Sequence, residues 1–185
     1  MAETKKRTRK PDTKEEQSRI FAFDMDGTLC EMFYGENCMN LYKDEDDKAI
    51  RRTFINDSYE NTRPIPQAQK LVSEIMDKVS SDSVYVITSI HNGMEFMHKT
   101  KWLENHFPGL NPSNVIGVIE EDDKARILHH IMSSHMGSNL LYVDDNLSYL
   151  IKIFALYHST YNVSVAHSSV ILTRTTEEFM KIYGI

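Results

Sequence analysis

The chain has 185 residues, of which 41% are hydrophobic and 26% are charged, with a formal net charge of −6. These proportions are ordinary for a globular protein, and the length suffices for one domain with a sizeable core. No apolar run approaches the ~18 residues of a membrane span, and none precedes Ile20, so we expect neither a membrane helix nor a secretory signal. Cys30 and Cys38 do not make a disulfide framework, which favours a cytoplasmic or nuclear location.

Charge is unevenly distributed along the chain. Residues 1–19 carry seven basic and four acidic side chains, a net of +3, which leaves −9 on the remainder. The basic run Lys5–Lys10 resembles a localisation signal or a nucleic-acid arm, but we favour a disordered, solvated tail over 1–19. The acidic remainder argues against broad nucleic-acid binding, because phosphate contacts require Lys and Arg.

Apolar patterning predicts the elements of the first half of the chain. A strand is predicted at Ile20–Phe23, and an irregular polar stretch over 30–63 follows it, with a short helix near 49–55. Pro64 and Pro66 restrict the backbone and prepare a helix start. The helix that follows has an apolar face made of Leu71, Val72, Ile75, Met76 and Val79.

The second half of the chain continues this alternation. The same periodicities predict strands at 84–88, 115–119, 139–143 and around 163–165, and helices at 94–107, around 127–132 and around 150–156. Thr175, followed by Glu177 and Glu178, begins a closing helix with a cap and acids in its first turn. Strands that alternate with helices indicate an α/β fold, with a mainly parallel sheet covered by helices on both faces. We predict one such domain over 20–185, with a small insertion at about 30–62.

The first strand ends in two carboxylates, Asp24 and Asp26, which are separated by one residue. Side chains at i and i+2 of an extended chain project in the same direction. Both acids therefore emerge at the carboxyl end of the strand, where open α/β sheets bind their ligands. Two like charges this close repel each other unless a cation or a shared proton holds them, so the arrangement favours a divalent metal.

Three later segments carry polar groups at comparable positions. One apolar run ends in Thr88 and Ser89, Lys124 begins a helical pattern after an acidic turn, and another apolar run ends in Asp144–Asp145. Together with Phe21–Leu29, these segments resemble the four ordered motifs of the haloacid dehalogenase (HAD) superfamily. The resemblance spans most of the globular part of the chain, and it implies a HAD-like Rossmannoid fold with a small cap in the insertion.

The family resemblance assigns roles to the two leading acids. Asp24 corresponds to the nucleophile, whose carboxylate forms an aspartyl-phosphate and divides hydrolysis into two easier steps. Asp26 corresponds to the general acid and base, and its main-chain carbonyl is expected to touch the metal. An acid at this second position implies a phosphatase or phosphomutase rather than a dehalogenase or a transport ATPase. Gly27 permits the turn that follows.

The resemblance also implies a metal site. Asp145 is expected to bind the ion together with Asp24 and the Asp26 carbonyl, and an all-oxygen site of this kind suits Mg²⁺. Asp144 would act through a metal-bound water or orient its neighbour, although it could instead merely cap the following helix. A zinc site is not expected, because the clustered histidines lack the spacing of a zinc motif and are expected at a helix surface: His129, His130 and His135.

Phosphate binding is expected at the two remaining motifs. Thr88 would donate its hydroxyl to the phosphate, and Ser89 would add a second hydroxyl or an amide. Lys124 would neutralise charge between Asp24 and the phosphate oxygens; such a pair at ~4 Å is worth about 4 kcal/mol before desolvation at an effective dielectric near 20. Lys101 is a competing candidate, but it lies within a helical stretch beside Trp102.

The insertion offers only indirect information about the substrate. Its aromatic residues could contact a base or a sugar, or could pack a lid onto the body: Phe33, Tyr34, Tyr42 and Tyr59. Residues 101–104, with the Asp144–Asp145 pair, resemble deoxyribonucleotidases and also the 3′-phosphatase domain of polynucleotide kinases. We therefore expect a Mg²⁺-dependent phosphomonoester hydrolase acting on a nucleotide or another small phosphorylated metabolite. The alternatives are a polynucleotide 3′-phosphatase and a catalytically silent HAD module used for binding.

Overall fold

The computed structural model describes residues 18–31, 59 and 62–183. These residues include a sheet with the strand order β3-β2-β1-β4-β5, in which every neighbouring pair is parallel. The strands are β1 (Arg19–Phe23), β2 (Val84–Ser89), β3 (Val115–Val118), β4 (Asn139–Asp144) and β5 (Asn162–His167). The predicted α/β fold is confirmed. The predicted helix near 49–55, most of the insertion, Cys38 and nearly all of the basic tail lie outside the described residues.

Helices connect the strands in the predicted alternation. They are α3 (Pro66–Met76), α4 (Gly93–His106), α5 (Glu121–Ser134), α6 (Leu147–Tyr157), α7 (Ser169–Thr173) and α8 (Thr176–Ile182), with short 3-10 turns η1 (Ser81–Ser83) and η2 (Pro112–Asn114) before β2 and β3. None of these helices is long and apolar enough to cross a membrane. The helix ends earlier than predicted: α3 ends at Met76, and Val79, predicted on its apolar face, packs against the core from the turn that follows. Helix α7 has no counterpart in the sequence prediction.

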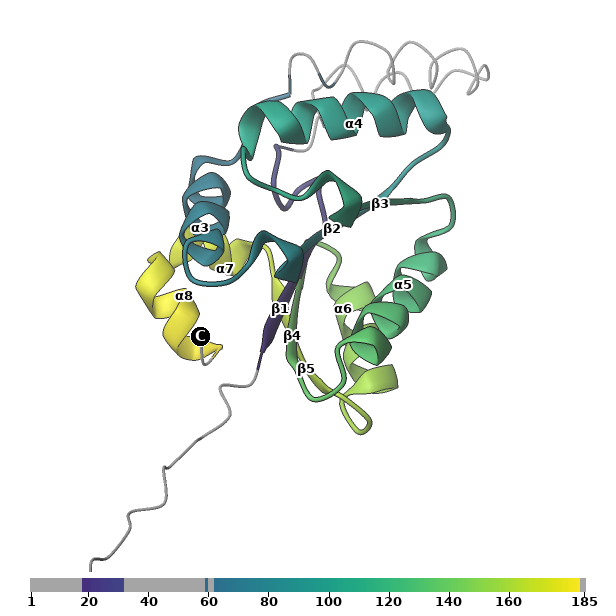
Figure 1. Ribbon diagram of the computed structural model, residues 1–185, viewed down its shortest axis with the longest axis vertical. Coiled ribbons are helices and arrows are strands. Elements are labelled where there is room, and N and C mark those ends of the chain that lie inside the picture. The colour runs from purple at the N-terminus through teal and green to yellow at the C-terminus, as the bar shows by residue number, and fades with distance from the viewer. Residues whose placement is uncertain (1–17, 32–58, 60–61, 184–185) are drawn as a thin grey trace, which may run out of the picture.

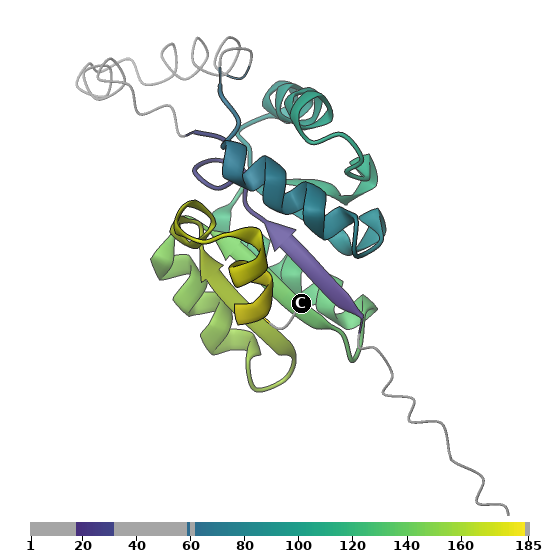
Figure 2. The same cartoon turned by 90° about the vertical axis from the view of Figure 1, so that its left-hand side faces the viewer.

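Two layers of helices cover the sheet (Figure 1). Helices α5 and α6 lie on one face, and α3, α7 and α8 lie on the other, which is the face turned to the viewer in Figure 2. Alternate residues of β1 supply both layers, since Phe21 and Phe23 belong to the core under α3 and α8, whereas Ile20 and Ala22 belong to the core under α5 and α6. A strand buried on both faces explains why β1 reads as a continuous apolar run.

The strand order places a crevice in the middle of the sheet. The chain runs from β1 outward through β2 to β3, and then returns across the sheet to β4, which pairs with the other edge of β1. The connections therefore leave β1 and β4 toward opposite sides, and ligands of open α/β sheets bind at the carboxyl ends of such a strand pair. Asp24 directly follows β1, and Asp144 ends β4.

Candidate active site

The turn after β1 fixes the first two acids. The main-chain N–H of Asp24 donates to the Val143 carbonyl at 2.8 Å, which joins the ends of β1 and β4. Gly27 has a φ of 74°, a left-handed conformation that favours glycine, and its N–H donates to the Cys30 carbonyl at 3.0 Å. The tight turn leaves the Asp24 side chain buried and keeps the Asp26 side chain partly exposed.

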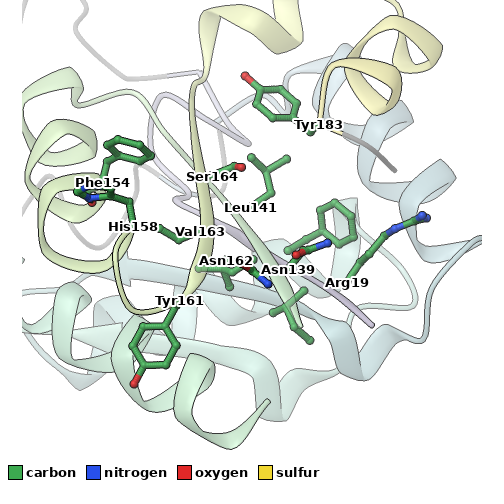
Figure 3. Close-up of a pocket in the computed structure, with 13 residues that line it drawn as sticks. Arg19, Asn139, Leu141, Phe154, His158, Tyr161, Asn162, Val163, Ser164 and Tyr183 are labelled. Carbon is green, nitrogen blue, oxygen red and sulfur yellow. The ribbon is translucent and has the colours of Figure 1, made fainter. Parts of the chain in front are cut away.

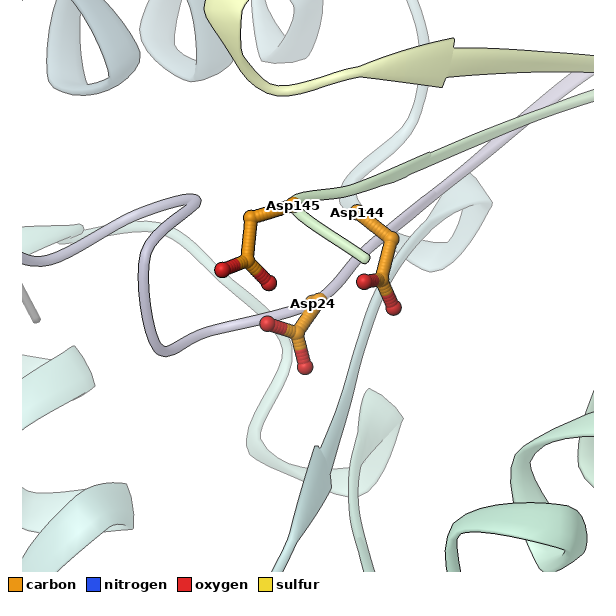
Figure 4. Close-up of side chains that lie close together, drawn as sticks. All are labelled: Asp24, Asp144 and Asp145. Carbon is orange, nitrogen blue, oxygen red and sulfur yellow. The ribbon is translucent and has the colours of Figure 1, made fainter. Parts of the chain in front are cut away.

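Three carboxylates gather at the ends of β1 and β4 (Figure 4). Asp24, Asp144 and Asp145 each offer an oxygen, and these oxygens all lie within 4.8 Å of one another. Asp24 and Asp144 are buried, whereas Asp145 is half-buried. The structure thus brings together the side chains that the first and fourth sequence motifs supply. Their oxygens are the ligand type that Mg²⁺ prefers, so this cluster fits a divalent hard cation.

Lys124 joins the same cluster from the first turns of α5. Its Nζ donates to Asp24 Oδ1 at 2.6 Å and to Asp144 Oδ2 at 3.2 Å. Asp144 has further partners, because the Tyr142 hydroxyl donates to its Oδ2 and the Asn146 N–H donates to its Oδ1 at 2.8 Å. Asn146, rather than Asp144, caps α6 through its side chain. Both carboxylate oxygens of Asp144 are therefore held by hydrogen-bond donors.

The electrostatics of the cluster favour a bound cation. Burial raises the pKa of Asp24 to about 8, although Lys124 acts in the opposite direction. Burial opposes the charge of Lys124, but Asp24 and Asp144 together raise the pKa of its ammonium. Burial and the neighbouring Asp144 also raise the pKa of the Asp145 carboxyl. A divalent ion beside these three carboxylates would favour their ionised forms.

Asp26 lies apart from the other three acids and has different partners. Lys99 Nζ donates to its Oδ2 at 2.7 Å, and the Tyr59 hydroxyl donates to its Oδ1 at 2.7 Å. Burial, followed by the charge of Asp26, raises the pKa of the Tyr59 hydroxyl, so Tyr59 acts here as a proton donor in a hydrogen bond. Tyr59, expected either to contact a base or sugar or to pack onto the body, packs against the hydrophobic core, and its hydroxyl also contacts Asp26.

Sequence reasoning missed Lys99. Its side chain is 1% exposed, and besides Asp26 it contacts Thr88 Oγ1 at 2.9 Å, the Ser89 carbonyl at 2.5 Å and Glu95 Oε1 at 3.3 Å. The available signal was its place on α4, because residues 95 and 99 occupy the same helical stripe as the buried Trp102 and Leu103. A Glu-to-Lys pair at i,i+4 ordinarily lies on a solvated face, whereas this one is buried against the site.

Other candidate residues lie elsewhere. Lys101 is exposed and lines a cavity of about 270 Å³ with Tyr59 and Trp102, rather than entering the acid cluster. His129 and His130 are exposed on α5, where a helix surface was expected. Cys30 is buried, and its Sγ lies 3.6 Å from Asp26 Oδ1.

A larger cavity of about 640 Å³ lies at the opposite end of the sheet (Figure 3). It is lined by residues that begin strands, such as Arg19 of β1, Asn139 of β4 and Asn162 of β5, and by the aromatic rings of Phe154 and Tyr183. The acid cluster lies where the same strands end, so this cavity is separate from it. The ionisable groups of the acid cluster lie at the carboxyl end of the sheet, and not in this cavity.

The groups around the two lysines carry an excess of negative charge. Among the described residues, Lys99 and Lys124 face the carboxylates Asp24, Asp26, Glu95, Asp144 and Asp145. Five carboxylates and two ammonium groups give a site that, when fully ionised, repels a phosphate anion. A divalent cation at the Asp24 cluster would reduce this repulsion and would supply a Lewis acid to the site.

Comparison with solved structures identifies the fold. A haloacid dehalogenase-like hydrolase from Burkholderia xenovorans LB400 covers 88% of this chain and 99% of its own, with 13% identity and a TM-score of 0.53. The HAD domain of the effector protein Lem4 from Legionella pneumophila covers 89% and 93%, with 14% identity and a TM-score of 0.52. The class C acid phosphatase from Bacillus anthracis covers 91% and 79%, with 12% identity and a TM-score of 0.54.

Sequence comparison gives no corresponding match. No protein-family model matches this chain, and no curated protein sequence matches it significantly. At identities of 12–14%, the structural likeness establishes the architecture and not the activity. The strand order, the acids at the ends of β1 and β4, and these structural neighbours together show that the chain has the fold of the haloacid dehalogenase-like hydrolases.

Proposed function

We propose that this protein is a Mg²⁺-dependent phosphomonoesterase that works through an aspartyl-phosphate at Asp24. One observation carries the proposal: the buried Asp24 carboxylate stands 2.6 Å from the Lys124 ammonium and within 4.8 Å of oxygens of Asp144 and Asp145. A nucleophile, a fixed positive charge and a set of oxygen ligands thus converge at the carboxyl end of the sheet. The acid phosphatase and the hydrolase among the structural neighbours support this reaction class by analogy of fold.

The first step transfers the phosphoryl group to the protein. An oxygen of Asp24 attacks phosphorus, the bond between phosphorus and the ester oxygen breaks, and Asp26 gives a proton to the departing oxygen. The product alcohol leaves, and the phosphate remains bonded to Asp24. The Asp26 side chain is 38% exposed, so its carboxyl can contact the ester oxygen of a bound substrate. Asp24 is buried at the base of the site, where it would face the phosphorus atom.

The second step releases inorganic phosphate. Asp26, now a carboxylate, takes a proton from a water molecule whose oxygen attacks phosphorus, and the bond between phosphorus and Asp24 breaks. Asp24 is then restored as a carboxylate, and Asp26 holds the proton from water, which replaces the one that left with the alcohol. Placing Asp24 and Asp26 two residues apart lets one turn supply both the nucleophile and the proton donor.

The remaining residues would bind the phosphate and the metal. The hydroxyl of Thr88, the end of β2 at Ser89 and the ammonium of Lys124 would hold phosphate oxygens. Asp24, Asp145, the Asp26 carbonyl and, directly or through water, Asp144 would hold Mg²⁺. When bound, Mg²⁺ supplies positive charge that stabilises the phosphate oxygens and keeps Asp24 ionised.

A small phosphorylated substrate, with a nucleotide as the leading class, is the preferred assignment. The alternative of a polynucleotide 3′-phosphatase draws its support from the basic run in residues 1–19. A silent binding module is disfavoured, because a scaffold gains nothing from keeping this repelling acid cluster with a lysine beside it. The acid phosphatase of Bacillus anthracis also has a structure with tungstate bound, and we propose that this oxyanion binds here in place of phosphate.

Phosphate release from a substrate panel tests the proposal. The panel contains nucleoside monophosphates, sugar phosphates and 3′-phosphorylated oligonucleotides, each assayed in EDTA and again with added Mg²⁺. We expect turnover only with Mg²⁺ and competitive inhibition by tungstate, with nucleoside monophosphates the preferred substrates. Release from the whole panel that stays at the level of an Asp24→Asn control would overturn the phosphatase assignment, and full activity in EDTA would overturn the metal requirement.

A further inference from the structure

The side chain of Lys99 projects from α4 into the interior, where its ammonium group donates three hydrogen bonds. The Nζ atom donates to Asp26 Oδ2 at 2.7 Å, to Thr88 Oγ1 at 2.9 Å and to the Ser89 carbonyl at 2.5 Å. A lysine ammonium has three N–H donors, so these contacts satisfy it completely. Only 1% of the side chain is exposed, and moving an ammonium out of water is costly unless such partners are present.

A second carboxylate fixes the ammonium from the side of its own helix. Glu95 Oε1 lies 3.3 Å from Lys99 Nζ, and Glu95 is itself buried. The other oxygen of Glu95 accepts the His91 N–H at 2.7 Å and lies 2.9 Å from His91 Nδ1. The Glu95 carboxylate is therefore anchored to the start of α4, and it holds Lys99 in place independently of Asp26.

Two partners of Lys99, Asp26 and Thr88, can still form hydrogen bonds to a ligand. The Asp26 side chain is 38% exposed, and its second oxygen accepts the Tyr59 hydroxyl at 2.7 Å and, at the longer distance of 3.6 Å, the Cys30 thiol. Thr88 Oγ1 accepts a hydrogen bond from Lys99 Nζ, so the Thr88 hydroxyl can still donate its own hydrogen to another acceptor. Its present acceptor, the Ser89 carbonyl, is 3.4 Å away, a long contact that a phosphate oxygen could replace.

We propose that Lys99 is a positioning residue that fixes the Asp26 carboxyl and the Thr88 hydroxyl relative to each other. The inference rests on the proposed function, in which Asp26 serves the ester oxygen and Thr88 binds a phosphate oxygen. One ammonium bonded to both groups sets the distance between the proton donor and the phosphate site. Lys124 has a different task, because its carboxylate partners are Asp24 and Asp144.

This role makes a specific kinetic prediction. Without Lys99, the Asp26 carboxyl is no longer aimed at the departing oxygen, so substrates that depend on leaving-group protonation should suffer most. The constant kcat/KM covers the steps up to formation of the phosphoenzyme, which include that protonation. A lysine with a merely structural role would instead lower kcat/KM equally for all substrates, by reducing the amount of folded protein.

The test compares Lys99→Met with the wild type on phenyl phosphates of similar shape and increasing leaving-group basicity. General acid catalysis contributes about 10²–10⁴-fold, so we expect kcat/KM for phenyl phosphate to fall by about 10²-fold or more, and for p-nitrophenyl phosphate by less than about tenfold. Lys70→Met is the matched control, since Lys70 also pairs with a glutamate at i,i+4 but is 70% exposed. Equal losses on all leaving groups, or no loss, would overturn the positioning role.

A second variant and a second readout keep the test decisive. Lys99→Met leaves Glu95 buried without its counter-charge, so Lys99→Met/Glu95→Gln provides a folded alternative if the single variant is unstable. Crystal structures of the variants should show the Asp26 carboxylate and the Thr88 hydroxyl displaced from their present positions. If the Asp26 carboxylate and the Thr88 hydroxyl keep their positions in the variants, the positioning role of Lys99 is wrong, whether or not the protein is a phosphatase. If both groups move but the wild type has no phosphatase activity, the proposed function alone is wrong.

Discussion

Asp24 and Asp26 are separated by one residue, yet they differ in burial and in the charged residues that contact them. Asp24 is buried beside Lys124 and two further carboxylates, whereas Asp26 is partly exposed and is held by Lys99 and Tyr59. Pairs of acids in contrasting environments are how enzymes obtain a nucleophile and a proton donor from the same side-chain type. The difference arises from the partners that each carboxylate meets, which are Lys124 at Asp24 and Lys99 at Asp26.

Substitution of the two acids should separate their roles. Asp24→Asn is expected to abolish turnover, because no phosphoenzyme can form. Asp26→Asn should slow leaving-group protonation and water attack, and a phosphoenzyme should accumulate with an activated aryl phosphate. Phosphate release and acid-quench trapping of labelled phosphoenzyme measure the two effects. Substantial turnover by Asp24→Asn would require a different nucleophile.

The buried Asp24 also makes stability depend on pH in the metal-free protein. Its pKa is raised from 3.8 to about 8 in the folded state, so unfolded chains release this proton at lower pH than folded ones. The contribution of Asp24 to the free energy of unfolding is therefore fully present below pH 3.8, the pKa of this carboxyl in the unfolded chain, and is lost as the pH rises toward 8. In EDTA, Asp24→Asn should be more stable than the wild type at pH 8, by roughly 2 kcal/mol or more, with a smaller difference at pH 5.

Urea unfolding of both proteins at the two pH values measures this effect. Asp77→Asn, an exposed position just after α3, is the matched control and should show no such pH-dependent gain. A constant difference between the wild type and Asp24→Asn across this pH range would mean that Asp24 stays ionised in the folded protein.

At the scale of elements, the ends of helices are specified locally. Thr175 caps α8 by accepting the Glu178 N–H at 3.2 Å, and the Glu178 carboxylate accepts the Thr175 N–H at 3.0 Å. This reciprocal capping box begins a helix that buries Phe179 and Met180 under the sheet. The sequence prediction placed the start of this helix correctly, because every partner lies within three residues.

Removal of the cap should destabilise the protein modestly. Thr175→Ala is expected to lower the free energy of unfolding by about 1 kcal/mol, as N-cap replacements typically do. Hydrogen bonds from Thr175 lower the pKa of Glu178, so the stability that Glu178 adds is present above its ordinary pKa of 4.5 and is lost as pH falls below it. Urea unfolding at pH 7 and at pH 3.5 should show a larger effect of Thr175→Ala at pH 7. An effect of the same size at both pH values would contradict the capping-box contribution.

At the scale of the whole molecule, metal binding should be visible in the folding equilibrium. A ligand that binds only the folded state at about 100 times its Kd stabilises it by about 2.7 kcal/mol. For a chain of this size, Mg²⁺ should therefore raise Tm by about 5 °C or more, and EDTA should reverse the shift. Asp145→Asn should keep its fold and lose most of the gain. An undiminished shift in Asp145→Asn would place the ion elsewhere.

Deletion of the basic tail tests the alternative substrate. The Asn139 N–H of β4 donates to the Ser18 carbonyl at 3.0 Å, so a truncated protein should retain Ser18 and begin there. All proposed site residues follow this position, and mononucleotide turnover and Tm should be unchanged. If residues 1–17 form a nucleic-acid arm, their loss and added salt should both selectively weaken action on 3′-phosphorylated oligonucleotides. Equal losses on both substrates would mean that this segment helps to build the active site.

The sequence by itself determined the order of strands and helices along the chain, the parallel α/β class and the places where the acids leave the strands. These features depend on local periodicity, on runs that end in polar residues and on caps within three or four positions. Where local rules compete, the prediction was wrong: the apolar pattern continued to Val79, but α3 ends at Met76, and the five-residue α7 was too short to show a period.

Only the tertiary structure decided which side chains meet. The partners of Lys99 lie 11 residues away at Thr88 and 73 residues away at Asp26, and no local pattern relates these positions. The stripe that Lys99 shares with Trp102 and Leu103 indicates a buried position, but charged residues ordinarily prefer water, so the contacts that stabilise this lysine are known only from the tertiary structure. The separation of Asp26 from the Asp24 cluster was likewise hidden, because spacing gives the direction of two side chains but not the charges that each of them will face.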